Sequence, residues 1–375
     1  MCGSVSGRGE LRRGWTTGTC ATAAAKAAYA ALCHGDFLDP VEVTLPRGER
    51  VAFTLAQTAR RGAAATAAVV KDAGDDPDVT HGALVRATVS LGAPGSGVVF
   101  RAGAGVGVVT RPGLPVPPGE PAINPVPRQM IRAALAEVAG GSADAVVEIG
   151  IENGEALAQR TLNGRLGIVG GLSILGTTGI VVPYSCAAWI DTIHRGIDVA
   201  RAMGLAHVAG STGATSEAAV QALHGLPEVA LIDMGDFAGG MLKYLRAHPV
   251  PRVTVAGGVA KITKLAQGRL DLHSKRGNAD LAVLAACARE HGGSADLGRR
   301  IAESNTVAEA FAHAAGAGLA LGDAVAAAAW SVAADAMRPA PIALEIAVFD
   351  RNGALVGRAP FASVHAASPS RNRRL

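Results

Sequence analysis

The sequence predicts a two-domain protein of mixed α+β and α/β class. An N-terminal α+β domain with a largely antiparallel sheet precedes a C-terminal domain of Rossmann-like parallel βα units. Three observations predict this. The 375 residues are enough for two hydrophobic cores. β-rich runs in the first part are separated mostly by turns, whereas from Ile180 onward they recur about every 24 residues with helical segments between them. We place the domains at 1–165 and 166–366, with a disordered basic tail at 367–375.

The first domain begins with an alanine-rich helix from about Thr19 to Cys33. A hairpin follows over VEVTLP-RGE-RVAFTL, with Gly48 in its turn. Further strands are expected at Ala67–Val70, Leu84–Leu91, Val98–Phe100 and Val106–Thr110. A proline-rich connector then leads to a helix over about Arg128–Ala139. This order of elements favours an antiparallel sheet packed against helices.

The second domain alternates strands and helices. The expected strands are Ala206–Ala209, Val229–Ile232 and Val253–Ala256. Such alternation predicts a parallel, doubly wound sheet. Helices dominate from Asp280 to Met337, and a hairpin over IALEIAVFD-RNG-ALVGRA follows them as the last regular element.

Composition and charge exclude several classes of protein. The net charge is only +4, and aromatic residues make up 3% of the chain. The sequence has no basic stripe interleaved with aromatics, so a nucleic-acid partner is not expected. The five cysteines form no CxxC pair, which argues against disulfides or a bound metal and fits a reducing cytoplasm. The first residues lack the apolar core of a signal peptide. We therefore expect a cytoplasmic protein without a membrane segment, and the sequence leaves a homo-oligomer open.

A long uncharged segment lies between Arg165 and Asp191. It is not a membrane helix, because glycines and a proline interrupt it. Its glycine pairs and hydroxyls indicate backbone that passes close to a bound molecule, and the residues concerned are Gly170, Gly171, Thr177 and Thr178. A glycine-rich crossover between domains explains the pattern equally well. Ile180–Val182, which follows, is expected to be a buried strand.

Two segments of the first domain have the composition of anion or cation sites. Thr16, Thr17 and Gly18 precede the alanine-rich helix, where free amides and hydroxyls favour a carboxylate or phosphate; an ordinary threonine cap is the alternative. The loop from Lys71 to Gly82 contains four aspartates, including Asp72. Their spacing is not that of a calcium loop, but they could bind a cation, an ammonium group or ribose hydroxyls. A solvated acidic turn is the alternative.

Alternating glycines mark another segment of the first domain. Gly103, Gly105 and Gly107 leave one face of a strand bare, against which a flat ligand or another backbone could lie. Arginines near this face suit carboxylates, and they are Arg101, Arg111 and Arg128. Exposed surface arginines are the alternative.

Two turns of the second domain follow β-rich runs and open helices. One holds Gly210, Thr212 and Gly213, and the other holds Asp233, Gly235, Asp236 and Gly239. A strand, a glycine turn and a helix form the geometry that holds an adenosyl group at the carboxyl edge of a parallel sheet. Further on, Lys261 and Lys264 lie three residues apart on one expected helix, with His273 in the loop after it. Two cations at this spacing can hold a polycarboxylate, and a histidine can move a proton near neutral pH.

Taken in order, these segments resemble one family, the cobalt-precorrin-5B C1-methyltransferases or CbiD family. The similar segments are GWTTGTCATAAAKAA, KDAGDDPDVTHG, GAGVGVVTRPGLPVPPGEPAINPVPRQMI, TLNGRLGIVGGLSILGTTGIV, GDFAGGMLKYL and GGVAKITKLAQG, with NTVAEAF further on. The resemblance implies methyl transfer from S-adenosylmethionine to ring carbon C1 of cobalt-precorrin-5B, giving cobalt-precorrin-6A, in the anaerobic pathway of cobalamin (vitamin B12) biosynthesis.

The resemblance also implies roles for the residues above. The corrinoid acceptor carries many carboxylates, so its pocket needs the arginines and lysines just named. The donor is expected at the turns near Gly210 and Gly235, with Asp233 or Asp236 on its ribose, although the acidic loop around Asp72 could hold its ammonium instead. Asp236 and His273 are the candidates for removing a proton. Little covalent catalysis is needed, because the sulfonium is a good leaving group and alignment dominates.

Two other functions compete with this one. A small-molecule kinase would use the helix start at Thr16–Gly18 as a phosphate cradle, although the sequence has no GxxxxGK[ST] motif. A non-catalytic tetrapyrrole carrier would bind the corrinoid without S-adenosylmethionine, and it would not need the two strand-end turns.

Overall fold

The computed structural model describes residues 11–365 and divides into two compact units, one up to Cys186 and one from Ala187 onward. The boundary therefore lies later than the expected Arg165. The reason is that three short strands of the glycine-rich segment pair with strands of the first unit: β11 with β9, β12 with β8 and β13 with β1. The expected tail at 367–375 lies outside the described residues.

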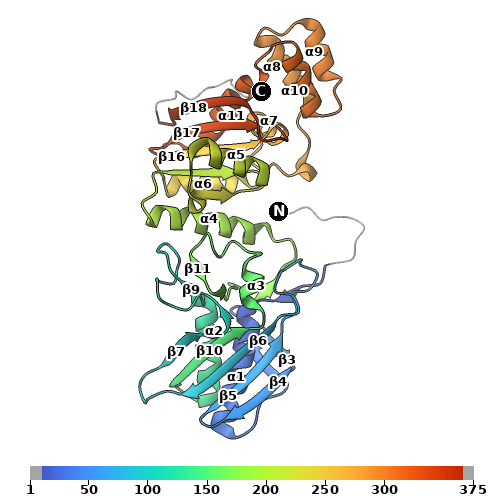
Figure 1. Cartoon of the computed structure of the whole chain (residues 1–375). Helices are drawn as coiled ribbons and strands as arrows, with labels where there is room; N and C mark the ends of the chain where they lie inside the picture. The colour runs from blue at the N-terminus through green and yellow to red at the C-terminus, as the bar shows by residue number, and fades with distance from the viewer. Residues whose placement is uncertain (1–10, 366–375) are drawn as a thin grey trace. The chain divides into compact units, whose positions relative to one another are not determined.

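The first unit contains thirteen strands and three helices within its described part, in this order: β1 (Gly14–Trp15), α1 (Thr17–His34), β2 (Val41–Thr44), β3 (Arg50–Phe53), β4 (Gln57–Arg61), β5 (Ala64–Val70), β6 (Leu84–Leu91), β7 (Val98–Ala102), β8 (Gly105–Val106), β9 (Val108–Val109), α2 (Pro125–Ala139), β10 (Ala145–Ile151), α3 (Gly154–Ala158), β11 (Ile168–Val169), β12 (Gly171–Leu172) and β13 (Ile180–Val181). Its main sheet has the order β4-β5-β6-β10-β7 (Figure 1). All neighbours are antiparallel except β10 and β7, so the largely antiparallel sheet is confirmed.

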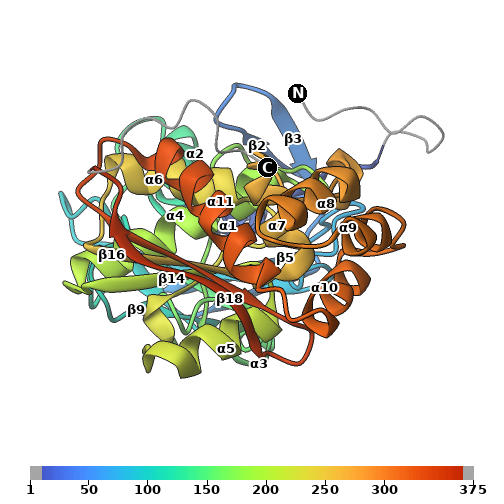
Figure 2. The same cartoon turned by 90° about the horizontal axis from the view of Figure 1, so that it is seen from above.

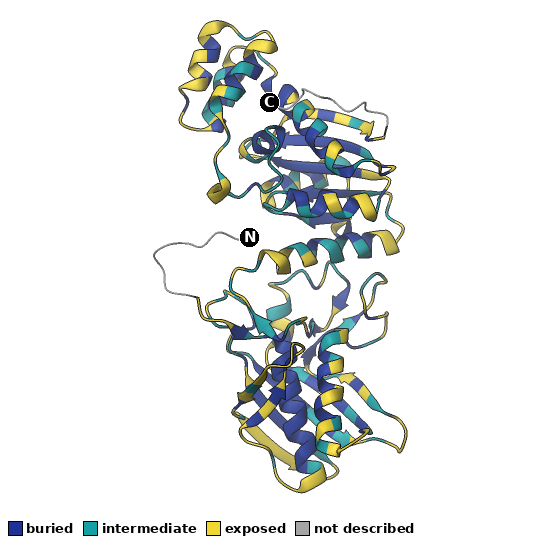
Figure 3. Ribbon diagram, turned by 180° about the vertical axis from the view of Figure 1, so that it is seen from behind, coloured by how far each residue is buried: buried dark blue, intermediate teal, exposed yellow. Residues whose placement is uncertain are grey.

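Helix α1 lies at the centre of the first core. Its alanines are buried along nearly the whole helix (Figure 3). Small side chains let the helix approach β5, β6 and α2 closely. The helix begins two residues earlier than expected because Thr16 accepts a hydrogen bond from the amide of Thr19 and caps it.

Two expectations for strands in the first unit were wrong, and one strand was not expected. Val106–Thr110 is not one strand but part of β8 and β9, which break at Gly107, where a Cβ would lie 2.5 Å from Ile168. Ile180–Val182 is not a buried strand, since β13 has two half-buried residues paired with β1. Strand β10, in the interior of the sheet, was not expected from the sequence.

The second unit follows the expected alternation of helices and strands. Its elements are α4 (Cys186–Ala202, whose first residue closes the first unit), β14 (His207–Ser211), α5 (Ala214–His224), η1 (Glu228–Ala230), β15 (Leu231–Asp233), α6 (Ala238–Ala247), β16 (Arg252–Gly258), α7 (Val259–Ala266), η2 (Ser274–Arg276), α8 (Leu281–Glu290), α9 (Ala295–Ala302), α10 (Val307–Gly316), α11 (Leu321–Met337), β17 (Ala343–Phe349) and β18 (Leu355–Ser363). The sheet order is β15-β14-β16-β17-β18, parallel except for β18. The helices after Asp280 and the last hairpin are confirmed.

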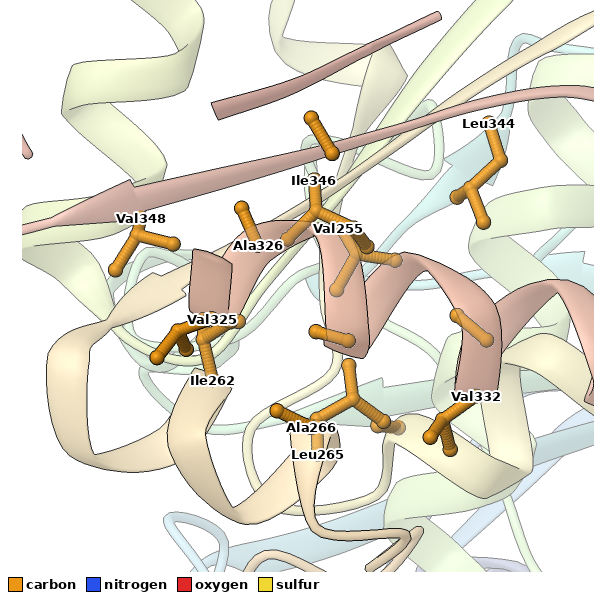
Figure 4. Packing of buried hydrophobic residues seen from close by; sticks show 14 of the residues in the cluster. Val255, Ile262, Leu265, Ala266, Val325, Ala326, Val332, Leu344, Ile346 and Val348 are labelled. Atoms are coloured by element: carbon orange, nitrogen blue, oxygen red, sulfur yellow. The ribbon is translucent and has the colours of Figure 1, made fainter. Parts of the chain in front are cut away.

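Helices cover both faces of this sheet. Helix α5 lies on one face, and α6 and α11 lie on the other (Figure 2). The larger core lies on the α11 side, where β16, β17, α7 and α11 interdigitate (Figure 4). Strands β15 and β16 flank β14 on opposite sides, and the turns after all three lie at the same carboxyl edge. In parallel sheets, ligands bind at the edge where the connections diverge in this way.

None of the helices within residues 11–365 combines the length and the apolar character needed to span a bilayer.

Candidate functional site

Three amides at the start of α1 are already bonded within the chain. The amide of Thr16 donates to Gly179 O (3.1 Å), the amide of Gly18 donates to Leu175 O (3.0 Å), and the amide of Thr19 is held by Thr16. Thr16 and Thr17 are buried. The glycine-rich segment thus passes over this helix end, and the ordinary cap, rather than a phosphate cradle, is the interpretation that the contacts support.

The expected acidic loop is held by ion pairs within the first unit. Lys71 is 2% exposed, and its ammonium pairs with Asp78. Asp72 accepts two hydrogen bonds from the guanidinium of Arg12, which lower the pKa of the Asp72 carboxyl from 3.8 to about 2. Both residues therefore order the loop, and neither presents an uncommitted charge.

Two of the three expected arginines bind the chain itself. Arg128 donates to Ile123 O, Pro121 O and Glu120. Arg111 donates to Arg165 O at 2.6 Å and packs against the backbone of Gly167. Arg101, on β7, is exposed. Of the three, Arg101 alone keeps an exposed position suited to a ligand carboxylate.

The alternating glycines of the first unit face another backbone rather than an open surface. A Cβ on Gly105 would lie 2.1 Å from Ile151 O, and one on Gly171 would lie 2.3 Å from Gly105. Gly170 has open space around its Cα. Thr178 bonds to its own turn at Ile180, whereas Thr177 is exposed. Gly170 and Thr177 therefore remain available to a ligand, and Gly171 serves strand pairing.

The carboxyl edge of the second sheet brings several candidates together. Asp236, in the turn after β15, pairs through Oδ1 with the ammonium of Lys261 on α7. The carbonyl of Asp236 accepts from the amide of Leu272 (2.8 Å), and Lys264 donates to the carbonyl of Leu272 (3.1 Å). Burial lowers the pKa of both lysines, that of Lys261 further through Lys264. Residues that are far apart in sequence thus form one charged cluster.

His273 lies next to this cluster but does not have the geometry of a base. Its Nδ1 accepts a hydrogen bond from the amide of Lys275 at 3.0 Å. A neutral imidazole that accepts at Nδ1 carries its proton at Nε2. His273 therefore offers a donor at Nε2, and of the two proposed proton acceptors Asp236 fits better.

The other residues expected to bind the methyl donor also lie at this edge, but their surroundings differ. A Cβ on Gly210 would lie 2.2 Å from Met241 Sδ, and one on Gly239 would lie 2.8 Å from Leu270, so these glycines permit close packing. Thr212 and Gly213 follow β14, and Gly235 follows β15 with φ +51°. Asp233 pairs in register with Ser211.

Sequence reasoning missed Trp189 at the same edge. Its indole Nε1 donates to Asp233 O at 3.2 Å, and its ring lies 3.4–3.5 Å from the position of a Cβ on Gly235. The ring is nevertheless 47% exposed. A fixed, exposed aromatic beside a turn is suited to stacking on a flat ligand. No sequence signal pointed to it, because Trp189 precedes the strands in an ordinary amphipathic helix.

A cavity of about 620 Å³ in the first unit was also missed. It is lined by parts of β6, β10 and α3, among them Arg86, Glu148, Glu152 and Glu155. Of the residues singled out from the sequence, Gly103 and Gly105 of the alternating-glycine segment line it. Within residues 11–365, no group of three or more His, Cys, Asp and Glu side chains is placed to hold a metal ion.

Comparison with known proteins identifies the family. Residues 4–183 match the CbiD family, and residues 271–360 match the CbiD C-terminal domain. A cobalt-precorrin-5B C(1)-methyltransferase of Agrobacterium fabrum is 63% identical over 368 residues, covering 97% of this chain and 98% of the relative. The protein of that name in Methylorubrum extorquens is 63% identical over 351 residues, covering 93% of this chain and 97% of the relative.

A crystal structure of the cobalamin biosynthesis protein CbiD from Archaeoglobus fulgidus is 28% identical, covers 72% of this chain and 84% of that chain, and has a TM-score of 0.38. The relatives from Agrobacterium and Methylorubrum match nearly end to end. The chain therefore belongs to the CbiD family.

Proposed function

We propose that this protein transfers the methyl group of S-adenosylmethionine to C1 of cobalt-precorrin-5B, giving cobalt-precorrin-6A in cobalamin biosynthesis. The observation that carries the proposal is the 63% identity over 97% of the chain with a methyltransferase of that name. The reaction forms a bond between the ring carbon and the methyl carbon and breaks the S–CH₃ bond. Sulfur keeps the electron pair, so that S-adenosylhomocysteine leaves.

We assign the donor to the carboxyl edge of the parallel sheet in the second unit, used in the Rossmann-like manner. The turns after β14 and β15 lie side by side at that edge, because the two strands pair in register. Thr212, Gly213 and Gly235 lie in these turns. Asp233 is the residue of β15 that would accept hydrogen bonds from the ribose hydroxyls of S-adenosylmethionine, or from another N–H or O–H group of this ligand.

Contacts to the acceptor are assigned within each unit separately. In the second unit, the side chain of Lys261 is a third exposed, and its ammonium suits a carboxylate of the ring. In the first unit, the exposed Arg101 and Thr177 are the remaining candidates. The paired Asp236 and Lys261 would hold and orient the acceptor, and Asp236 is the group that would take a proton if one is released.

The test is mass spectrometry of the purified protein incubated with enzymatically prepared cobalt-precorrin-5B and S-adenosylmethionine. We expect one added methyl group that depends on protein and donor, and a strong loss of rate for Asp236→Asn. A lack of methylation although the donor binds would point to another acceptor, such as a metal-free ring. A lack of both methylation and donor binding would overturn the proposal.

A further inference from the structure

The carboxyl end of β14 contains a hydroxyl group that the fold leaves without a partner. Ser211 is 1% exposed, and its Oγ has no hydrogen-bond partner among the described residues 11–365. The backbone there is satisfied, since the carbonyl of Ser211 accepts from the amides of Met234 and Gly235, both at 3.1 Å. A buried hydroxyl without a partner opposes folding, so a ligand that binds it is a physical reason for its presence.

Ser211 faces helix α5. Side chains alternate along a strand, so Ser211 shares the face of Ala209, which packs with Val220 of α5. The helix begins at Ala214, directly after Thr212 and Gly213, and no side chain caps it. The buried hydroxyl therefore lies on the side of the strand from which this helix starts.

The first turn of α5 is open. Gly213, Ala214 and Thr215 are exposed, and within the part of the chain that the structure describes the amides of Ala214 and Thr215 donate to no protein acceptor. Free amides and the positive end of the helix dipole favour a carboxylate. A serine hydroxyl can donate a further hydrogen bond to the same group.

A negative charge lies next to this anion-binding arrangement. Asp233 pairs in register with Ser211 on the adjacent strand β15, so its side chain is on the same face. A bare anion would be repelled by this carboxylate. A ligand that carries an ammonium group beside its carboxylate, as an α-amino acid does, matches both charges.

We infer that Ser211 Oγ and the first turn of α5 bind the carboxylate of an α-amino acid group whose ammonium lies toward Asp233. The inference rests on the proposed function, in which this group is the methionyl end of the methyl donor. It assigns Ser211 and the amides of α5 as donor-binding groups, and it orients the donor along the edge of the sheet.

The first experiment compares two ligands by calorimetry on the full chain: S-adenosylhomocysteine, which has the amino acid group, and 5′-methylthioadenosine, which lacks it. We expect Ser211→Ala to weaken binding of S-adenosylhomocysteine about tenfold, as for the loss of one hydrogen bond to a charged group, and to leave binding of methylthioadenosine unchanged. Ser331→Ala, which removes a half-buried serine hydroxyl on α11 that donates to Ala327 O, is the control.

The second variant is Ala214→Pro, which removes one amide of the first turn. Proline is favoured at the first position of a helix, and the extended Gly213 (φ 165°, ψ 169°) tolerates a following proline. We expect folding to be kept, as judged by thermal unfolding, with the same selective loss of affinity for S-adenosylhomocysteine. Ser211→Ala should not lower the melting temperature, because it removes an unsatisfied hydroxyl.

Three results would overturn the inference. Unchanged binding of S-adenosylhomocysteine to both variants would show that the carboxylate lies elsewhere. Equal loss for both ligands would place Ser211 on the adenosine, and selective loss of cobalt-precorrin-5B binding would place it on the acceptor. If the unmodified protein binds the donor and methylates its acceptor, these results leave the proposed function intact, whereas absence of any donor binding removes both.

Discussion

Helices α1 and α5 begin with similar sequences and differ in what covers them. The chain runs through Thr16, Thr17 and Gly18 into α1, and through Ser211, Thr212 and Gly213 into α5. At α1, the glycine-rich segment lies over the helix start and accepts the amide hydrogens of Thr16 and Gly18. At α5, the first turn is exposed and uncapped. A turn rich in glycine and hydroxyls therefore marks a close approach, but only the surrounding fold decides whether the approaching group is the chain or a ligand.

The largest difference in stability between the two helix starts is expected when a glycine beside each of them is replaced by alanine. A Cβ on Gly176 would lie 2.3 Å from Thr16 Oγ1, and Gly176 has φ +132°, so Gly176→Ala should destabilise the protein by about 4 kcal/mol through strain and overpacking. Gly213 has open space around its Cα and an extended φ of 165°. Gly213→Ala should therefore change stability by less than about 1 kcal/mol.

Chemical denaturation of the two variants measures this contrast. A similar, small effect of both substitutions would show that the segment over α1 yields easily, and the distinction between a closed and an open helix start would fail.

The next contrast is between two lysines with different surroundings. Lys71 is buried and paired with Asp78, so Lys71→Ala should cost about 3 kcal/mol of stability by leaving a partly buried carboxylate unpaired. The side chain of Lys261 is a third exposed, so its removal lets water reach the unpaired Asp236; Lys261→Ala should cost about 1 kcal/mol, less than Lys71→Ala, but lower methyl transfer at least tenfold.

The measurements are unfolding by urea and the initial rate of methylation for each variant. Lys261→Arg serves as a control that keeps the charge. Full activity of Lys261→Ala would remove Lys261 from the site, and a stable Lys71→Ala protein would refute the structural role of Lys71.

The smallest effects on stability are expected from lowering the pH, and the two units should lose stability in different pH ranges. His207 in the second unit has a pKa lowered from 6.5 to about 4, first by burial and then by the neighbouring His224. The unfolded chain protonates this histidine at a higher pH than the folded chain does. The stability contributed by neutral His207 is therefore fully present above about pH 6.5 and is lost as the pH falls toward 4. Asp72 in the first unit has a lowered pKa of about 2, so its contribution is lost only between about pH 3.8 and 2.

Melting temperatures between pH 7 and 4 test this order, with His207→Gln as the comparison. Between pH 6.5 and 4, the melting temperature of His207→Gln should fall less than that of the native chain. The melting temperature of Asp72→Asn should fall as much as that of the native chain in this range. An identical pH profile for the native chain and His207→Gln would contradict the assignment to His207.

Much of the second unit followed from sequence, and much less of the first. Strands β14, β15 and β16 were expected because short β-rich runs at regular spacing specify parallel units locally. The sequence pattern predicts no strand at β10 and one strand over Val106–Thr110, and it is wrong in both places because pairing between distant segments decides both. For the site, the strand-end turns were found by pattern. Trp189 and Ser211 were not, since the environment of a single side chain leaves no periodic signal.

By itself, the sequence determined the family and the parallel units, both of which depend on local order along the chain. It left the helix cap at Thr16 open against an anion site, and the contacts of the folded chain show the cap. Only the tertiary structure decided which charged and glycine-rich segments are committed to the fold. Arg128 and Lys71 have the residue types of ligand contacts, yet their hydrogen bonds and ion pairs go to the chain. Ser211 has an unremarkable residue type, yet its hydroxyl is buried without a partner among the residues that the structure describes. The physical reason is that satisfaction of a polar group depends on groups far away in sequence, which only folding brings within hydrogen-bonding distance.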